Sequence, residues 1–209
     1  SLSSSIAMAL KSDRTLWTWG TYTYALGDDV TSRSVPGQIA TDVVGIAAGH
    51  YHALFVKADG KVWVWGNNSA ALGTPNSPVR TAVSLTSIAN VVAVSAGAFH
   101  SLALKADGTV WAWGANTYGE VGDGSQTVVP TPKHVVGISG VRAIAAGGNF
   151  SLALADDGGA GGSVWAWGRN AEGELGDGTT VDRFYPMRVA LPRPIVAIAA
   201  GSFHAVALA

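Results

Sequence analysis

The chain has 209 residues, the length of one domain or of two small ones. Its 13 basic and 14 acidic residues give a net charge of −1 and a charged share of only 13%, which excludes a disordered tail, a coiled coil and a nucleic-acid-binding arm. Cysteine is absent, and no apolar run is long enough for a transmembrane helix, so disulfide frameworks, cysteine zinc sites and membrane insertion are excluded from the prediction.

The tryptophans show that the chain is a repeat. All eight lie in four W-x-W-G motifs spaced by about 50 residues. The tryptophans of these motifs are Trp17 and Trp19, Trp63 and Trp65, Trp111 and Trp113, and Trp165 and Trp167. We interpret them as structural residues that fill the gap between neighbouring sheets.

In chain order, the first predicted strand is 6–10, followed by a turn at Asp13–Arg14 and the first Trp strand. Each later repeat opens with an apolar run that ends in glycine, at 43–49, 91–97, 141–147 and 195–201. Three residues after that glycine stand His52, His100, Phe150 and His204, which begin a second apolar run. An Asp-Gly turn, the Trp strand, a long polar loop and a short outer run complete the unit.

These runs are short, rich in Val, Ile, Leu, Ala and Trp, and separated by glycine, which is typical of strands. Asp59–Gly60 and Asp107–Gly108 predict two-residue hairpins with type I′ turns, in which both central residues have positive φ. The strands are apolar on both faces, so both faces must be covered. The sequence therefore predicts an all-β fold made of β-propeller blades, each a four-stranded antiparallel sheet packed between its neighbours.

The units do not add up to a closed ring. The chain holds five second-position runs (6–10, 52–56, 100–104, 150–154 and 204–208) but four Trp strands. We predict one repeat domain over 1–209, with repeats at 1–42, 43–90, 91–140 and 141–194, and 195–209 beginning a further repeat. This favours an arc, or partial propeller, whose uncovered ends can self-associate. A small closed ring with one redundant strand is the alternative.

Several of these segments resemble the regulator of chromosome condensation repeat. They are Asp107–Gly114, the loop Gly173–Thr179 and the strand His100–Leu104, and the resemblance covers essentially the whole chain. It implies a propeller fold. Members of that family include an exchange factor for the GTPase Ran, a plant ultraviolet-B photoreceptor and a bacterial β-lactamase inhibitor, so the resemblance alone does not assign a function.

The motifs carry no evident catalytic or metal chemistry. His52, His100 and His204 recur at a repeat spacing rather than a chelate spacing, so we interpret them as buried structural histidines. His50 and His52, on one face of a strand, give a weak two-ligand signal. Asp123 and Asp177 are interpreted as turn caps rather than calcium ligands. No catalytic residue, metal ligand or cofactor is predicted.

The long loops remain as the candidate binding surface, because loops on a rigid scaffold carry most binding functions. Tyrosine and arginine are common anchors of protein interfaces. The candidate partner-binding residues are Tyr22, Tyr24, Arg33, Tyr118, Arg169, Arg183, Phe184 and Tyr185.

The sequence therefore favours a non-enzymatic protein-interaction module with a protein partner, no nucleic acid and no membrane insertion. The low charge and the abundance of small residues favour a bacterial secreted or cell-surface protein. The alternative, implied by the resemblance, is a guanine-nucleotide exchange factor for a small GTPase.

Overall fold

The computed structural model describes residues 6–22, 24, 26–67, 70–74, 78–156, 158 and 161–209. These residues form seventeen strands and no helix, which confirms the prediction of an all-β fold. The described part of the chain has no helix that is long and apolar enough to cross a membrane.

The strands form five antiparallel sheets in which sequence neighbours pair. The first sheet contains β1 (Ile6–Leu10), β2 (Leu16–Thr21) and β3 (Ser32–Ala40). The three sheets that follow each have four strands, which are β4 (Val43–Ala48), β5 (His52–Lys57), β6 (Val62–Gly66) and β7 (Val79–Ser84); β8 (Val91–Ala96), β9 (His100–Lys105), β10 (Val110–Gly114) and β11 (Val129–His134); and β12 (Val141–Ala146), β13 (Phe150–Asp156), β14 (Gly162–Gly168) and β15 (Arg183–Arg188). The last sheet contains β16 (Ala197–Ala200) and β17 (Ala205–Leu208).

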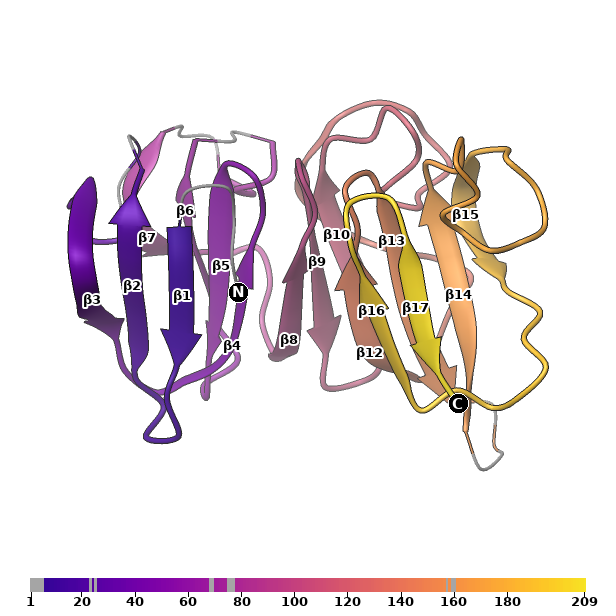
Figure 1. The fold of residues 1–209 in the computed structure, drawn as a ribbon, viewed down its shortest axis with the longest axis horizontal. Coiled ribbons are helices and arrows are strands. Elements are labelled where there is room, and N and C mark those ends of the chain that lie inside the picture. Colours follow the sequence, from indigo (N-terminus) through magenta and orange to yellow (C-terminus); the bar gives the residue numbers. More distant parts are fainter. Residues whose placement is uncertain are drawn as a thin grey trace.

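The sheets stand side by side as the blades of a partial propeller (Figure 1). The inner strands β4, β8, β12 and β16 contact one another in series. Backbone hydrogen bonds link successive blades at one end of these strands, from His50 N to Ala98 O (3.3 Å), from Ala98 N to Gly148 O (2.9 Å) and from Gly148 N to Ser202 O (3.1 Å). Strands β1 and β17 lie in different sheets, at the two ends of the arc. The partial propeller is thus confirmed, and the alternative of a small closed ring is wrong.

The Asp-Gly hairpins have three-residue loops rather than the predicted two-residue loops, and only the glycine of each has positive φ. Gly60 has φ 77° and Gly108 has φ 78°, whereas the aspartate before each has negative φ, so the predicted type I′ turns are wrong. Gly60 N donates to Lys57 O at 2.9 Å, which closes a three-residue loop with the glycine in the left-handed region. The aspartate instead caps the turn, since Lys61 N donates to its carboxylate at 3.1 Å. The corresponding turn of the fourth repeat, Asp157–Gly158, lies partly outside the described residues.

Three of the four outermost strands contain prolines, among them Pro36 in β3, Pro132 in β11 and Pro186 in β15. Each strand begins several residues before the proline named here. Proline is tolerated here because these strands are sheet edges and their register shifts against the Trp strands.

Tryptophans join each blade to the one before it. Trp65, Trp113 and Trp167 are fully buried between blades, and Trp19, in the first sheet, is only partly buried. The first tryptophan of each motif is partly exposed. Lys105 lies 5.2 Å from the ring of Trp111, and equivalent lysines lie over Trp17 and Trp63. Trp165 is likewise partly exposed.

Two buried histidines also join neighbouring blades. His52 Nε2 lies 2.9 Å from Ser101 Oγ, and His100 Nε2 lies 3.0 Å from Ser151 Oγ. Because Ser101 donates its hydroxyl proton to Ala71 O at 2.8 Å, it must accept from His52, which fixes the Nε2-protonated tautomer. Burial is the main reason that the pKa of His52 falls to about 3 and that of His100 to about 4.

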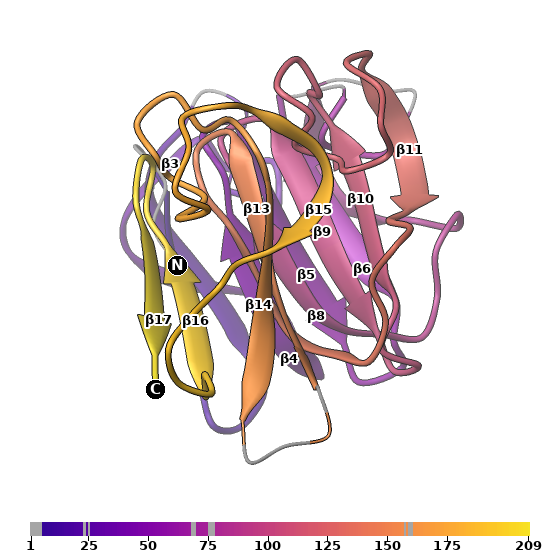
Figure 2. The same ribbon diagram turned by 90° about the vertical axis from the view of Figure 1, so that its right-hand side faces the viewer.

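His204 differs from the expectation of a buried histidine. It is exposed, because no further blade of the described chain covers that side of the β16–β17 hairpin (Figure 2).

Candidate functional site

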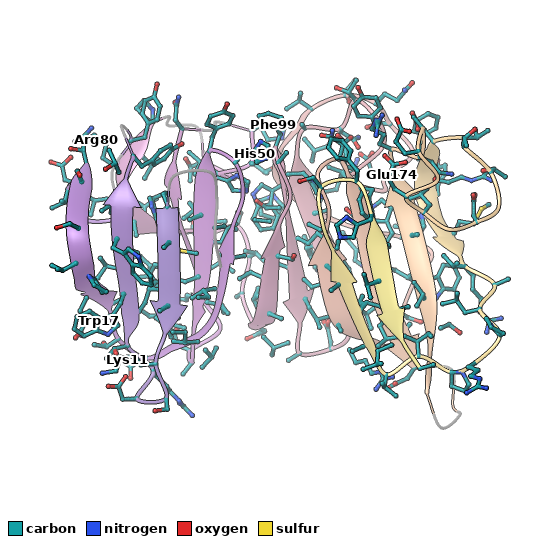
Figure 3. All side chains as sticks on the ribbon, in the orientation of Figure 1. Lys11, Trp17, His50, Arg80, Phe99 and Glu174 are labelled. Atoms are coloured by element: carbon teal, nitrogen blue, oxygen red, sulfur yellow. The ribbon has the colours of Figure 1, made fainter. Side chains whose placement is uncertain are left out.

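The short loops before β5, β9, β13 and β17 and the long loops after β2, β6, β10 and β14 lie at one end of the blades. We call this end the loop face. In the second blade, which contains β4 to β7, His52 pairs with Gly66, so the short loop before β5 and the long loop after β6 lie at the same end of the strands. The same pairing recurs between His100 and Gly114 and in the fourth blade. Figure 3 shows His50, Phe99 and Glu174 at this end, and Lys11 and Trp17 at the opposite end.

In the long loops of the third and fourth repeats, one buried asparagine forms hydrogen bonds with several other residues of its loop. Asn170 accepts a hydrogen bond from Leu175 N at 3.0 Å and donates to Asp177 Oδ1 and Thr179 O, each at 3.1 Å. Asn116 makes the equivalent bonds in the third repeat. Both asparagines are fully buried, so each amide ties together backbone groups that would otherwise be unsatisfied.

The aspartates of these loops cap turns and also form an ion pair with a basic side chain. Asp177 accepts bonds from Thr179 N at 2.9 Å and from Arg183 Nε at 2.7 Å. Partial burial alone would raise the pKa of Asp177, but these bonds outweigh it and lower the pKa to about 2. Asp123 has the same arrangement with Ser125 and Lys133, and its pKa also falls to about 2. These contacts agree with the interpretation of both residues as caps.

Replacing Asn170 with alanine is expected to loosen the fourth-repeat loop by about 2 kcal/mol, because several buried hydrogen-bonding groups lose their partner together. Hydrogen exchange of the amides of residues 171–181 checks this. The exposed Thr180 provides a matched control in the same loop, and an equal gain in exchange for Thr180→Ala would contradict the role of the asparagine.

The candidate partner-binding residues of the first repeat, Tyr22, Tyr24 and Arg33, make contacts within the chain. Tyr22 is buried, and its hydroxyl donates to Tyr51 O at 2.9 Å; burial raises its pKa to about 12. Tyr24 packs edge-on against Tyr22 with ring centroids 5.7 Å apart. Arg33 forms an ion pair with Asp28, and only 15% of its side chain is exposed.

The remaining candidates come together where the third-repeat loop meets β15. Phe184 packs against Gly119, and the hydroxyl of Tyr185 lies over Gly124, so blade four reaches the loop that carries Tyr118. Tyr185 is 59% exposed. Arg183 is bound to Asp177.

Arg169 makes its contacts with other residues. It is bound to Glu174 and Glu172, and its guanidinium lies 5.7 Å from the ring of Phe203.

The sequence interpretation missed the aromatic residues of the short loops. Tyr51, Phe99 and Phe203 stand one position before the recurrent histidine, and all three are exposed. The rings of Tyr51 and Phe99 stack with centroids 5.7 Å apart, and His50 meets Phe99 edge-on at 5.9 Å. We call His50, Tyr51, Phe99 and Phe203 the aromatic rim. The signal was present, since this position is aromatic in three of four repeats.

The aromatic rim borders a cavity of about 390 Å³ at the inner end of the blades. Its lining is mostly glycine and alanine from all four short loops, together with His50 and Ser202. His50 lies in the loop before β5 and not in the strand, and His52 is bound to Ser101, so the weak two-ligand signal does not correspond to a shared site. Among the described residues, no three His, Asp or Glu side chains cluster in a way that could hold a metal ion.

Comparisons with known proteins agree with this architecture. A family model described as the RCC1-like domain matches residues 1–207. The chain belongs to the RCC1-like domain family. The family resemblance predicted from the repeat motifs is thereby confirmed.

Several solved structures superpose closely on the chain. Human WBSCR16 has a TM-score of 0.84 and 26% identity over 100% of this chain and 56% of that chain. Yeast RCC1 (Prp20), solved bound to Kap60, has a TM-score of 0.84 and 25% identity over 97% of this chain and 52% of that one. A further Saccharomyces cerevisiae Prp20p structure, reported with its binding properties to Gsp1p and histones, has a TM-score of 0.82 and 25% identity over 97% of this chain and 53% of that chain.

The chain spans about half the length of these structures and far less of its curated relatives. The human E3 ubiquitin-protein ligase HERC2 is 38% identical over 94 residues, which is 43% of this chain and 2% of that protein. These comparisons show the RCC1-like family and its propeller fold, and the fold alone does not assign a function.

Proposed function

We propose that this RCC1-like arc is a non-enzymatic scaffold that binds a protein partner through its loop face. The observation that carries the proposal is the aromatic rim, in which the exposed rings of His50, Tyr51 and Phe99 are held side by side on short, hydrogen-bonded loops. Exposed aromatic rings on a rigid support are the usual anchors of protein interfaces, since they bury a large area at a small cost in conformational entropy.

The charges of the loop face favour a protein over a nucleic acid. Arg33, Arg169, Arg183 and Lys133 each form an ion pair with a carboxylate of their own loop. A phosphate backbone is bound by cations that are available to it, whereas these cations are already neutralised. The small-residue cavity beside the rim suits insertion of a partner side chain between the rings.

Removing two rings of the aromatic rim is expected to abolish binding of a protein partner without unfolding the chain. The double variant Tyr51→Ala with Phe99→Ala should lose the proteins retained by the wild-type chain on an affinity column, because two adjacent anchors are lost together. The triple variant Tyr118→Ala, Arg183→Ala and Tyr185→Ala tests the candidates predicted from sequence. Equal retention by all three chains, each shown to be folded by its thermal transition, would refute binding through the loop face.

Guanine-nucleotide exchange on a small GTPase is the second candidate, and the similarity to yeast RCC1 (Prp20) supports it. Release of labelled GDP from Ran in the presence of the chain provides the measurement. We expect no acceleration, because the chain spans about half of that structure. Acceleration that Tyr51→Ala with Phe99→Ala leaves unchanged would replace the scaffold proposal.

A further inference from the structure

A groove lies between the first and second blades, which stand at the left of Figure 1. It has a volume of about 540 Å³ and is larger than the cavity beside the aromatic rim. One wall is formed by β3 and Thr41, and the other wall is formed by β5, β6 and β7. No residue of the aromatic rim lines the groove, so the two features are separate.

The linker between these two blades is shorter than the two linkers that follow. In each blade, one residue of the outermost strand pairs with the first tryptophan of the motif. From that residue to the next inner strand, the first linker has four residues, 39–42, whereas the second and third have six, 85–90 and 135–140. The first linker therefore lacks two residues that its counterparts have.

The longer linkers each bury an isoleucine. Ile88 is 6% exposed and Ile138 is 7% exposed. Ile138 and Trp165 line the same hollow between the third and fourth blades, which places this isoleucine beside the first tryptophan of its joint. The first linker has no residue at this position, because its own isoleucine, Ile39, corresponds to Leu85 of the second linker. The space beside the tryptophan is therefore left open between the first two blades.

Two aromatic rings form a flat apolar wall in this space. The rings of Phe55 and Trp63 stack with their centroids 5.8 Å apart and an interplanar angle of 6°. Phe55 pairs with Trp63 across the strands, where the third and fourth blades have Ala103 and Ala153. Trp63 is partly exposed and Ile39 lines the opposite wall. A planar ring can pack between these two walls.

A lysine without a carboxylate partner lies at the same wall. Lys57 lines the groove, and its Nζ lies 5.2 Å from the centroid of the Trp63 ring. The equivalent lysines of the first and third blades each pair with the aspartate of their turn. In the second blade that aspartate, Asp59, pairs with Lys61 at 3.3 Å. No carboxylate of the described residues pairs with Lys57, so its charge is available to an anion.

The indole N–H of Trp63 is also without a partner. It is buried and has no hydrogen-bond acceptor among the described residues. In the first and third blades, the equivalent N–H donates to the hydroxyl of a threonine two positions earlier, Thr15 at 2.8 Å or Thr109 at 3.3 Å. The second blade has Lys61 at that position. A buried donor left without an acceptor is costly, and an oxygen of a bound molecule would remove that cost.

We propose that this groove is a binding site for a small organic acid with a flat apolar body, such as an arylacetate. The body packs on Phe55 and Trp63, in the space that a linker isoleucine fills elsewhere. The carboxylate accepts hydrogen bonds from the Lys57 ammonium and the Trp63 N–H. Asp28, the carboxylate of the lining, is already paired with Arg33 and does not compete for Lys57. Because the groove and the aromatic rim are separate, the inference is independent of the proposed function.

The probe is 4-fluorophenylacetate, whose ¹⁹F NMR signal is followed as the full 209-residue chain is added. We expect the signal to shift and broaden in a saturable way. The amine 4-fluorophenethylamine keeps the ring and reverses the charge. It should bind at least about tenfold more weakly, because it loses the charge-assisted hydrogen bond. Equal affinity for the acid and the amine, or no saturable binding of the acid, would overturn the proposal.

A pair of lysine variants locates the charge that binds the acid. Lys57→Met keeps an unbranched side chain beside the indole and removes the charge, so it should weaken binding of 4-fluorophenylacetate at least about tenfold. Lys105→Met is the matched control, since Lys105 also lies 5.2 Å from a tryptophan ring but stands at a joint whose linker carries Ile88. It should change the affinity less than about twofold. Equal losses in the two variants would contradict binding in the groove.

A second pair of variants tests the indole N–H. Lys61→Thr restores the threonine of the first and third blades, and Lys61→Val has the same shape without the hydroxyl. Threonine is expected to accept the Trp63 N–H within the chain, so it should bind the acid about threefold or more weakly than the valine variant. The same affinity in both variants would overturn the assignment of this N–H as a donor to the carboxylate.

Filling the groove is the steric test. Replacing Thr41 with residues 87–89 of the second linker, Ser-Ile-Ala, gives the first linker six residues and the missing isoleucine. Replacing it with Ser-Gly-Ala gives the same length without the side chain. We expect the isoleucine variant to lose 4-fluorophenylacetate and the glycine variant to keep it, with both shown to be folded by their thermal transitions. Unchanged binding by a folded isoleucine variant would place the acid elsewhere and overturn the proposal, and the lysine pair decides it if that variant does not fold.

Discussion

Replacing Trp113 with alanine is expected to lower the free energy of unfolding by about 3–5 kcal/mol. The indole is fully buried between two blades, packs on Gly73 and donates to Ala71 O at 2.7 Å. Its loss leaves a large cavity in the joint and removes one of the donors to that carbonyl. Urea denaturation followed by far-ultraviolet circular dichroism measures the change.

Trp111→Ala is the matched control, because the same residue type is removed from the same strand. Trp111 is partly exposed and lies under Lys105, so its removal should lower the free energy of unfolding by only about 1 kcal/mol. If the two variants were equally destabilised, burial between blades would not be what distinguishes the two tryptophans of the motif.

The second large effect is a loss of stability in mild acid. An unfolded histidine has a pKa near 6.5, and the folded values fall to about 3 for His52 and about 4 for His100. Both folded pKa values are depressed, so below pH 6.5 the unfolded chain binds more protons than the folded one. The free energy of unfolding is therefore highest above pH 6.5 and falls as the pH drops, by about 1.4 kcal/mol per pH unit for each histidine.

Urea midpoints measured between pH 7 and pH 4.5 check this slope. The double variant His52→Gln with His100→Gln should flatten it, and His134→Gln, at an exposed position, is the control for the substitution itself. Asp123 and Asp177 do not interfere, because their stabilisation is lost only as the pH falls below their ordinary value of 3.8 towards about 2. An unchanged slope in the double variant would show that these histidines are not the groups that titrate.

Much of the fold could be predicted because the periodicity is strong. The glycine that ends each inner strand, the histidine three residues later and the paired tryptophans are local signals, and the strands begin or end within a few residues of them. The hairpin type could not be predicted, because Asp-Gly fits both a two-residue and a three-residue loop. Only the bond from Gly60 N to Lys57 O distinguishes them.

The candidate site was harder to predict because exposure depends on tertiary contacts. Tyr22 and Tyr185 look alike in the sequence, but the hydroxyl of Tyr22 is bound to Tyr51 O and its ring is buried, while Tyr185 remains exposed. Arginines that look available each have a carboxylate from their own loop. The aromatic rim arises only when short loops of successive blades are brought together by their backbone hydrogen bonds.

The histidine–serine joints have a consequence for how such a protein can evolve. Where a blade has His52 or His100, the next blade supplies Ser101 or Ser151, and where a blade has Phe150, the corresponding residue of the next strand is Ala205. A tandem copy of the second blade would place the imidazole of His52 against the methyl group of Ala53, and a tandem copy of the fourth would place the hydroxyl of Ser151 against the ring of Phe150, whereas a copy of the third blade carries both His100 and Ser101 and would fit. Neighbouring units are thus matched at this joint, and the third blade is the unit whose copy would fit without a change at these two positions.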